Sequence, residues 1–150
     1  MLTTVIAVLG TLLGAVVAGL INNRAARTAR DVARGDQRRN TELEAVTAFA
    51  SAVAAHRRAM VVREDLRLSG ADPEHVAAAR AESHATRSAI EAPKVRVSIL
   101  VPALAPAATE AAQASYALRG AADSRRLDLL REHAIKAADN FTAAAARHFA

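Results

Sequence analysis

LEAVTAFASAVAAHRRAMVVREDL, residues 43–66, is the stretch that decides how this chain folds. Its core-facing positions recur at steps of three and four residues, the spacing that places side chains on one face of an α-helix. The pattern therefore predicts an amphipathic helix that ends near Leu66, where Ser69-Gly70 supplies a typical C-terminal stop. The predicted core stripe of this helix consists of Leu43, Val46, Ala50, Val53, Arg57 and Met60.

A second helix should begin directly after this stop. Asp72 can accept hydrogen bonds from free backbone N–H groups, and Pro73 fits the first helical position. The helix should continue to about Glu91, before Pro93. Residues 94–101, KVRVSILV, alternate as a strand would, but the chain offers no second strand-like segment to pair with them. We therefore interpret this segment as the kinked end of the second helix.

Two further helices are expected toward the C-terminus. The third should run from about Pro106 to Leu118 and end at Gly120, and Asp123 or Ser124 should cap the fourth. Four helices with short connections predict an all-α fold, an antiparallel bundle of about four helices over residues 41–150. The fourth helix repeats apolar residues at steps of three and four, namely Leu127, Leu130, Ala134, Ala137, Phe141 and Ala144.

Alanine dominates the composition, with 40 of the 150 residues. Alanine is the best helix former, but an alanine-rich core buries little apolar area per residue. A bundle of this kind gains stability from self-association, so we expect a homo-oligomer.

Upstream of residue 23 the chain carries no charge, and residues 2–21 read LTTVIAVLGTLLGAVVAGLI. About 20 apolar residues in a helix match the hydrocarbon thickness of a bilayer. The sequence thus predicts a single transmembrane helix over residues 1–22. It should run without a break through a basic juxtamembrane stalk, residues 23–40, into the bundle.

Six arginines follow the apolar segment, against only Asp31 and Asp36. Basic residues next to a span favour the cytoplasmic side, which predicts an inner (plasma) membrane protein with its N-terminus outside and its C-terminal domain in the cytoplasm. The spacing of the arginines places several on one helical face, where they would contact anionic lipids. The alternative is an ordinary stop-transfer cluster. The predicted lipid-contacting residues are Arg24, Arg27, Arg30, Arg34 and Arg38.

Two other interpretations of residues 1–22 remain open. Val16-Val17-Ala18 imitates a signal-peptidase site, but no basic residue precedes the apolar segment. A buried helix of a soluble domain is rarely apolar on all sides over this length. Within the segment, Gly10, Gly14 and Ala18 form a small-xxx-small pattern that would let two spans pack closely.

The charge distribution argues against nucleic acid as a direct partner. The chain has a net charge of +5, but residues 24–39 hold six arginines and two aspartates, a net +4. The bundle residues are therefore close to neutral. Three Phe, one Tyr and no Trp also give little material for stacking on bases.

We expect no enzyme, cofactor, metal site or small-molecule substrate. The chain has no Cys, no glycine-rich phosphate loop and no H-E-x-x-H pattern. A bundle interior could gather His56, Glu64 and His84 from two helices, but solvent-facing or hydrogen-bonded histidines are the more ordinary reading.

One basic patch is a candidate docking site for an acidic partner surface: His56, Arg57, Arg58 and Arg63. The competing reading is an exposed, salt-bridged helix face.

The chain resembles the KilB family of mycelial actinobacteria. The likeness lies in residues 6–19, IAVLGTLLGAVVAG, with arginines after them, in residues 43–71 and in ESHATRSAI, residues 82–90. It continues more weakly through ASYALRGAAD, residues 114–123, whereas KVRVSILVPALAPA, residues 94–107, departs from the pattern. The resemblance implies a membrane protein associated with conjugal plasmid transfer and spread between mycelial compartments, with transfer-machinery proteins as partners.

Together these observations predict a membrane-anchored helical assembly protein that takes part in plasmid transfer or spread. Two alternatives are a membrane-disrupting protein of the holin or toxin type and a scaffold or signalling adaptor. The long folded domain favours assembly or scaffolding, because such a domain is not needed for making holes.

Overall fold

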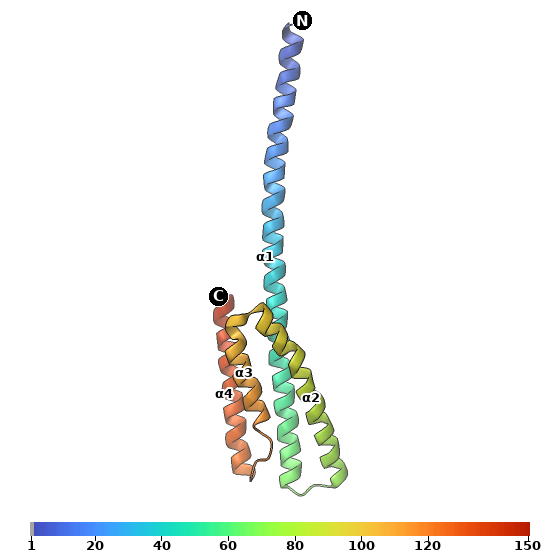
Figure 1. The fold of residues 1–150 in the computed structure, drawn as a ribbon, viewed down its shortest axis with the longest axis vertical. Coiled ribbons are helices and arrows are strands. Elements are labelled where there is room, and N and C mark those ends of the chain that lie inside the picture. Colours follow the sequence, from blue (N-terminus) through green and yellow to red (C-terminus); the bar gives the residue numbers. More distant parts are fainter. Residues whose placement is uncertain (1) are drawn as a thin grey trace. The chain divides into compact units, whose positions relative to one another are not determined.

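The computed structural model describes the backbone from residue 2 onward (Figure 1) and the side chains of residues 30–150. The fold is all-α, with four packed helices and one short 3₁₀ turn. Among residues 30–150, none of the helices has a stretch long and apolar enough to cross a bilayer. The predicted span at residues 1–22 lies outside the described side chains. The elements are α1 (Leu2–Leu68), α2 (Pro73–Leu100), η1 (Pro102–Leu104), α3 (Ala105–Tyr116) and α4 (Ser124–Phe149).

The chain divides into two compact units, Met1–Thr41 and Glu42–Ala150. The second unit is the helical bundle, formed by the last part of α1 together with α2, α3 and α4. Within it, helices that follow one another along the chain run in opposite directions, so that the α1–α2 and α3–α4 turns lie at the same end (Figure 1). This is the predicted antiparallel arrangement.

Local signals set the helix ends as the sequence indicates. The Asp72 side chain accepts a hydrogen bond from the Glu74 N–H at 3.2 Å, and Pro73 is the first residue of α2. Asp123 caps α4 by accepting from the Arg126 N–H at 2.7 Å. Gly70, after α1, has a φ of 66°, in the left-handed region that glycine adopts without steric cost.

Helix α2 continues through Pro93 to Leu100, so residues 94–100 are helical and Val101 is the C-cap. A proline inside a helix cannot donate the usual backbone hydrogen bond, but tertiary packing can hold the helix together. Ile90 and Val97 are fully buried on either side of Pro93. The interpretation of this segment as the end of the second helix is confirmed.

The main core lies where α1, α2, α3 and α4 meet. Phe49 from α1 contacts Phe141 from α4, with ring centroids 4.9 Å apart in an edge-to-face arrangement. Alanines of α3, among them Ala108, Ala111 and Ala112, are buried against these rings. Their small side chains allow α3 to approach its neighbours closely. A second cluster around Met60, Leu118 and Leu127 fills the end of the bundle that carries the two turns.

The predicted core stripe of α1 needs a correction. Leu43 is 47% exposed, and Ala50 and Arg57 lie only at the edge of the buried face. The buried face shares Val46, Val53 and Met60 with the prediction but is turned by a fraction of one residue step, because Phe49 contributes more apolar area than Ala50 and so faces the core. In consequence His56 and Glu64 point inward. The buried residues of this face are Ala45, Val46, Phe49, Val53, His56, Met60 and Glu64.

Candidate interaction site

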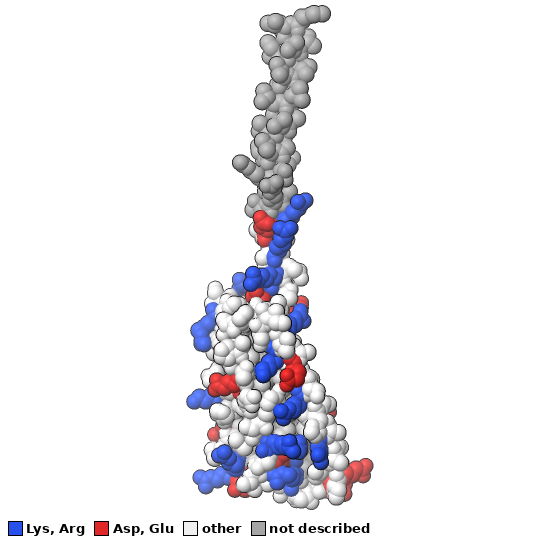
Figure 2. Space-filling view, viewed as in Figure 1, with Lys and Arg blue, Asp and Glu red and all other residues white. Residues whose placement is uncertain are grey.

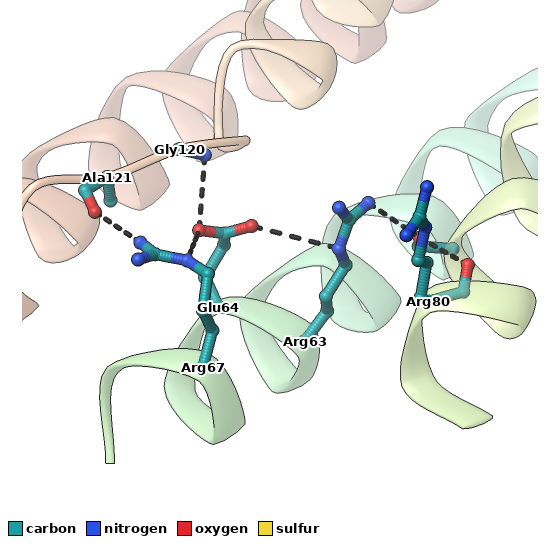
Figure 3. Close-up of polar contacts among 7 residues, drawn as sticks. Arg63, Glu64, Arg67, Arg80, Gly120 and Ala121 are labelled. Atoms are coloured by element: carbon teal, nitrogen blue, oxygen red, sulfur yellow. Dashed lines mark hydrogen bonds and ion pairs between the residues drawn. The ribbon is translucent and has the colours of Figure 1, made fainter. Parts of the chain in front are cut away.

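Glu64 is the most unusual residue of the bundle, a carboxylate that is only 1% exposed (Figure 3). Its Oε2 accepts a hydrogen bond from Arg67 Nε at 2.8 Å and from the Gly120 N–H at 3.1 Å. Its other oxygen, Oε1, lies 3.9 Å from Arg63 Nε. A buried carboxylate is tolerated when it is paired with cations and hydrogen-bonded, and here two cations lie beside it and Oε2 accepts two hydrogen bonds.

The same arginines extend the network to other elements (Figure 3). Arg67 donates to the Ala121 carbonyl in the turn between α3 and α4. Arg63 donates to Ser83 Oγ on α2 at 3.1 Å. Glu64 and its two arginines therefore tie the end of α1 to α2 and to the α3–α4 turn. This arrangement fixes the relative positions of the helices at that end of the bundle.

His56 forms a second buried polar contact, about two turns earlier on α1. Its Nδ1 lies 3.1 Å from Thr86 Oγ1, which donates its own proton to the Glu82 carbonyl at 2.9 Å. The neutral ring then carries its proton on Nδ1. Burial and, next, the positive charges of Arg87 and Arg63 lower the pKa of His56 to about 4. His56 is therefore uncharged at neutral pH.

Tyr116 closes this layer toward solvent. Its ring packs edge-to-face on His56, with centroids 5.4 Å apart. The guanidinium of Arg87, on α2, lies 4.1 Å from the centroid of the Tyr116 ring. The Tyr116 hydroxyl donates to Glu91 Oε1 at 3.3 Å. Burial and the adjacent Glu91 carboxylate raise the pKa of Tyr116. The layer connects α1, α2 and the end of α3.

The predicted docking patch is not one surface. His56 is buried, and Arg63 is occupied by Ser83 and Glu64 with its side chain 14% exposed. Both face α2, because the buried face of α1 is rotated from the predicted stripe. Arg58 is exposed and Arg57 is half-buried at the edge of α4. Only these two arginines can meet a partner.

The predicted lipid-contacting residues are described in part. Arg30, Arg34 and Arg38 on α1 are exposed, and Arg34 makes a 3.3 Å ion pair with Asp31. Arg24 and Arg27 lie outside the described side chains, as do Gly10, Gly14 and Ala18. Lipid contact and packing between spans stay predictions.

The three candidate metal ligands, His56, Glu64 and His84, each have a different environment. Glu64 is engaged by arginines and a backbone N–H, His56 is bonded to Thr86, and His84 is exposed. Among residues 30–150, no three His, Asp or Glu side chains are placed to share a metal ion.

A groove runs between α1 and α4 on the side where Arg57 and Arg58 lie. One part, of about 300 Å³, is bordered by Arg57, Arg58, Val61, Val62, Arg131 and Ile135. An adjoining part of about 190 Å³ also borders on Arg57 and is walled by Ala50, Ala54, Ala138, Asp139 and Thr142. Sequence reasoning missed Arg131 and Ile135, because only the fold brings this face of α4 beside α1. Neither residue lies on the predicted core stripe of α4, and this is the one sequence signal that indicated a surface position for them.

Comparison with known proteins settles the family. Residues 43–149, which cover almost the whole bundle, match the family described as KilB plasmid transfer protein. The chain belongs to this family. It is also 61% identical over 149 residues to Protein KilB of Streptomyces lividans, and the match covers 99% of each chain. No solved structure matches the chain.

The match to the KilB family coincides with the unit that the structure describes in most detail. It begins one residue after the bundle unit starts and ends one residue before the C-terminus. The predicted resemblance to this family is confirmed.

Proposed function

We propose that this chain is a membrane-anchored assembly protein of plasmid transfer, acting in plasmid spread between mycelial compartments. The observation that carries the proposal is the 61% identity to Protein KilB over 149 residues, which include residues before the bundle as well as the bundle itself. Membership of a plasmid transfer family supplies the process, and the sequence and the bundle supply the mode of action.

The sequence supports an anchor at the N-terminus. Residues 2–21 are uncharged and long enough to span a bilayer as a helix, and six arginines follow by residue 39. An inner-membrane protein with its N-terminus outside would present the bundle to the cytoplasm, where anionic headgroups can interact with the arginines.

The bundle supports a role in binding other proteins. Its buried polar groups, Glu64 and His56, bond to other parts of the same bundle and fix its shape. Its surface arginines Arg57 and Arg58 remain available to a partner. A rigid bundle with exposed arginines on its surface is suited to binding other proteins.

The decisive experiment removes the gene from a transferable plasmid and restores it in two forms, complete or without residues 1–22. Spread within the recipient mycelium should fall in the deletion strain, while transfer into the recipient persists. The complete gene should restore spread and the truncated gene should not. Unchanged spread in the deletion strain contradicts the proposed process.

Membrane extraction tests the anchor separately. The complete protein should sediment with membranes and resist alkaline carbonate, and the form without residues 1–22 should remain in the supernatant. Overexpression of the complete protein should leave the membrane potential unchanged. Rapid depolarisation that depends on residues 1–22 would instead favour a membrane-disrupting function.

A further inference from the structure

We propose that the groove between α1 and α4 binds an amphipathic helix whose apolar face is flanked by carboxylates, supplied by a partner protein. The inference depends on the proposed function only in treating the bundle as the part that binds partners. It concerns a surface that the sequence prediction did not define, because half of that surface comes from α4.

The charges around the groove favour an acidic partner. Arg57 and Arg58 border it from α1 and Arg131 borders it from α4. None of the three guanidinium groups has a hydrogen bond or an ion pair to another residue in the part of the chain described with side chains. Among residues 30–150, Asp139 on the wall of the adjoining part is the one acidic residue that borders the groove, so the arginines outnumber it three to one. The groove thus gathers guanidinium groups that can bind carboxylates bidentately without first breaking an internal contact.

The floor of the groove favours an apolar face. Val62 is 54% exposed and Ile135 is 37% exposed, although both are large hydrophobic residues. They lie on facing helices beside Val61, between the arginines. An apolar floor with a charged rim is the arrangement of specific protein interfaces, where the centre supplies affinity and the rim supplies orientation.

The dimensions of the groove favour a helix. Its walls extend from Ala50 to Val62 on α1 and from Arg131 to Thr142 on α4. At about 1.5 Å rise per residue, each wall is roughly 17 Å long, which matches about three helical turns. Ala54 and Ala138 keep the second part of the groove open, because neither side chain extends far. A helix of this length would place anchors at positions i, i+3 or i+4, and i+7.

Two other occupants fit the groove less well. A second copy aligned in the same direction would place Arg57, Arg58 and Arg131 against the same arginines, and like charges oppose such a contact. A bilayer surface supplies anionic charge, but it does not fill a concave groove between two helices. Acidic helical segments satisfy both the charge and the shape.

Fluorescence anisotropy with the complete protein in a neutral detergent tests the proposal. The probe is a labelled synthetic helical peptide with leucines at i, i+3, i+7 and glutamates on either side. A second peptide carries lysines in place of the glutamates. The glutamate peptide should bind with a dissociation constant in the micromolar range, because the contact is small. The lysine peptide should bind at least tenfold more weakly. Raising the salt concentration should weaken binding of the glutamate peptide more than binding of the lysine peptide.

Matched variants locate the binding site. R57E/R58E/R131E should weaken binding of the glutamate peptide at least tenfold. R80E/R125E/R147E makes the same change in net charge at exposed positions away from the groove and should leave binding nearly unchanged. For the floor, Val62→Asn should weaken binding severalfold, whereas Val95→Asn, at a 55% exposed valine of α2, should not. Circular dichroism confirms that each variant is folded.

The outcomes separate the occupants. Equal binding of both peptides, or equal losses in the groove and control variants, overturns the proposal. Binding of anionic vesicles that requires Arg57, Arg58 and Arg131, with no binding of the glutamate peptide, assigns the groove to lipid and also overturns it. Dimerisation that rises with protein concentration and is abolished by Val62→Asn would assign the groove to a second copy and would also overturn the proposal. The role in plasmid spread stands or falls by the gene deletion, independently of these results.

Discussion

Glu64 can be buried because its carboxylate accepts hydrogen bonds from Arg67 and the Gly120 N–H and forms a longer ion pair with Arg63. Neutralising the side chain should leave these donors poorly satisfied. Since Arg67 is 43% exposed and water can replace part of its contact, we expect Glu64→Gln to lower the free energy of unfolding by about 2 kcal/mol, below the cost of a fully buried pair. Urea unfolding of the complete protein, followed by circular dichroism in detergent, measures this change.

The neighbouring acidic residue provides the control. Asp65 is exposed, so Asp65→Asn should change the free energy of unfolding by less than about 0.5 kcal/mol. Equal effects of the two substitutions would contradict the role assigned to Glu64.

His56 should make the stability of the bundle depend on pH. Its pKa is lowered from 6.5 to about 4, so between these values the unfolded chain binds more protons than the folded one. The free energy of unfolding therefore rises with pH in this window. The contribution is complete above about pH 6.5 and is lost as the pH falls toward 4, by at most about 3 kcal/mol.

The measurement compares the melting temperature of the natural chain with that of His56→Gln from pH 7 to pH 4.5. The advantage of the natural chain should shrink on acidification, because glutamine does not titrate. His84→Gln, at an exposed histidine, should show a constant difference across the same range. A constant difference for His56→Gln as well would show that burial of the imidazole is not linked to pH.

At the residue scale, periodicity predicts part of the core. Val46, Val53 and Met60 are placed correctly, whereas Ala50 and Arg57 are chosen over Phe49 and His56. The two stripes share Val46, Val53 and Met60 and have nearly the same spacing, so only the size of Phe49 could have separated them. The burial of Glu64 depends on Gly120, 56 residues away, and local spacing carries no information on that contact.

Among the elements, the turn between α3 and α4 depends on one backbone conformation. Gly120 has a φ of 77°, and its N–H donates to Glu64. No neighbouring atom would touch a methyl group there, so the cost of Gly120→Ala is conformational. We expect it to lower the free energy of unfolding by about 1–2 kcal/mol. Chemical denaturation of the complete protein tests this value.

Gly35 is the matched control for that substitution. It lies inside α1 and also has no neighbour within 4 Å of an added methyl group. Because alanine favours helix, Gly35→Ala should not destabilise the protein and should raise the helical signal slightly. A loss of stability at Gly35 comparable to that at Gly120 would argue against the conformational explanation.

Caps and breakers predict the elements better than they predict the contacts. Asp72, Pro73, Gly120 and Asp123 mark helix ends correctly, because each acts on its own backbone or its immediate neighbours. Pro93 is the exception, since the helix continues past it. Burial of Ile90 and Val97 holds this part of α2 in place, and such tertiary support is absent from any local pattern.

For the molecule as a whole, the groove between α1 and α4 is the feature that sequence reasoning could not assemble. Arg57 and Arg58 are visible as a basic pair on one helix, but Arg131 lies more than 70 residues later. Figure 2 shows basic and acidic side chains interspersed over the visible face of the bundle, so net charge alone selects no surface. The fold selects one by bringing unpaired arginines of two helices to the same groove.

The orientation of the proposed membrane anchor is the last property that charge predicts at this scale. The arginines at positions 24, 27, 30, 34 and 38 follow an uncharged segment, and no basic residue precedes it. Retention of basic residues in the cytoplasm should hold the C-terminus inside. A green fluorescent protein fused after residue 150 should therefore fluoresce, and alkaline phosphatase at the same position should be inactive.

Replacing these five arginines by glutamate should remove the charge asymmetry and give a mixed population, with measurable phosphatase activity. Five arginine-to-glutamate changes at exposed positions of the bundle should leave the orientation unchanged, because charges far from the span contribute little. Phosphatase activity in the natural chain, or none after the juxtamembrane replacement, would show that the arginines do not determine orientation.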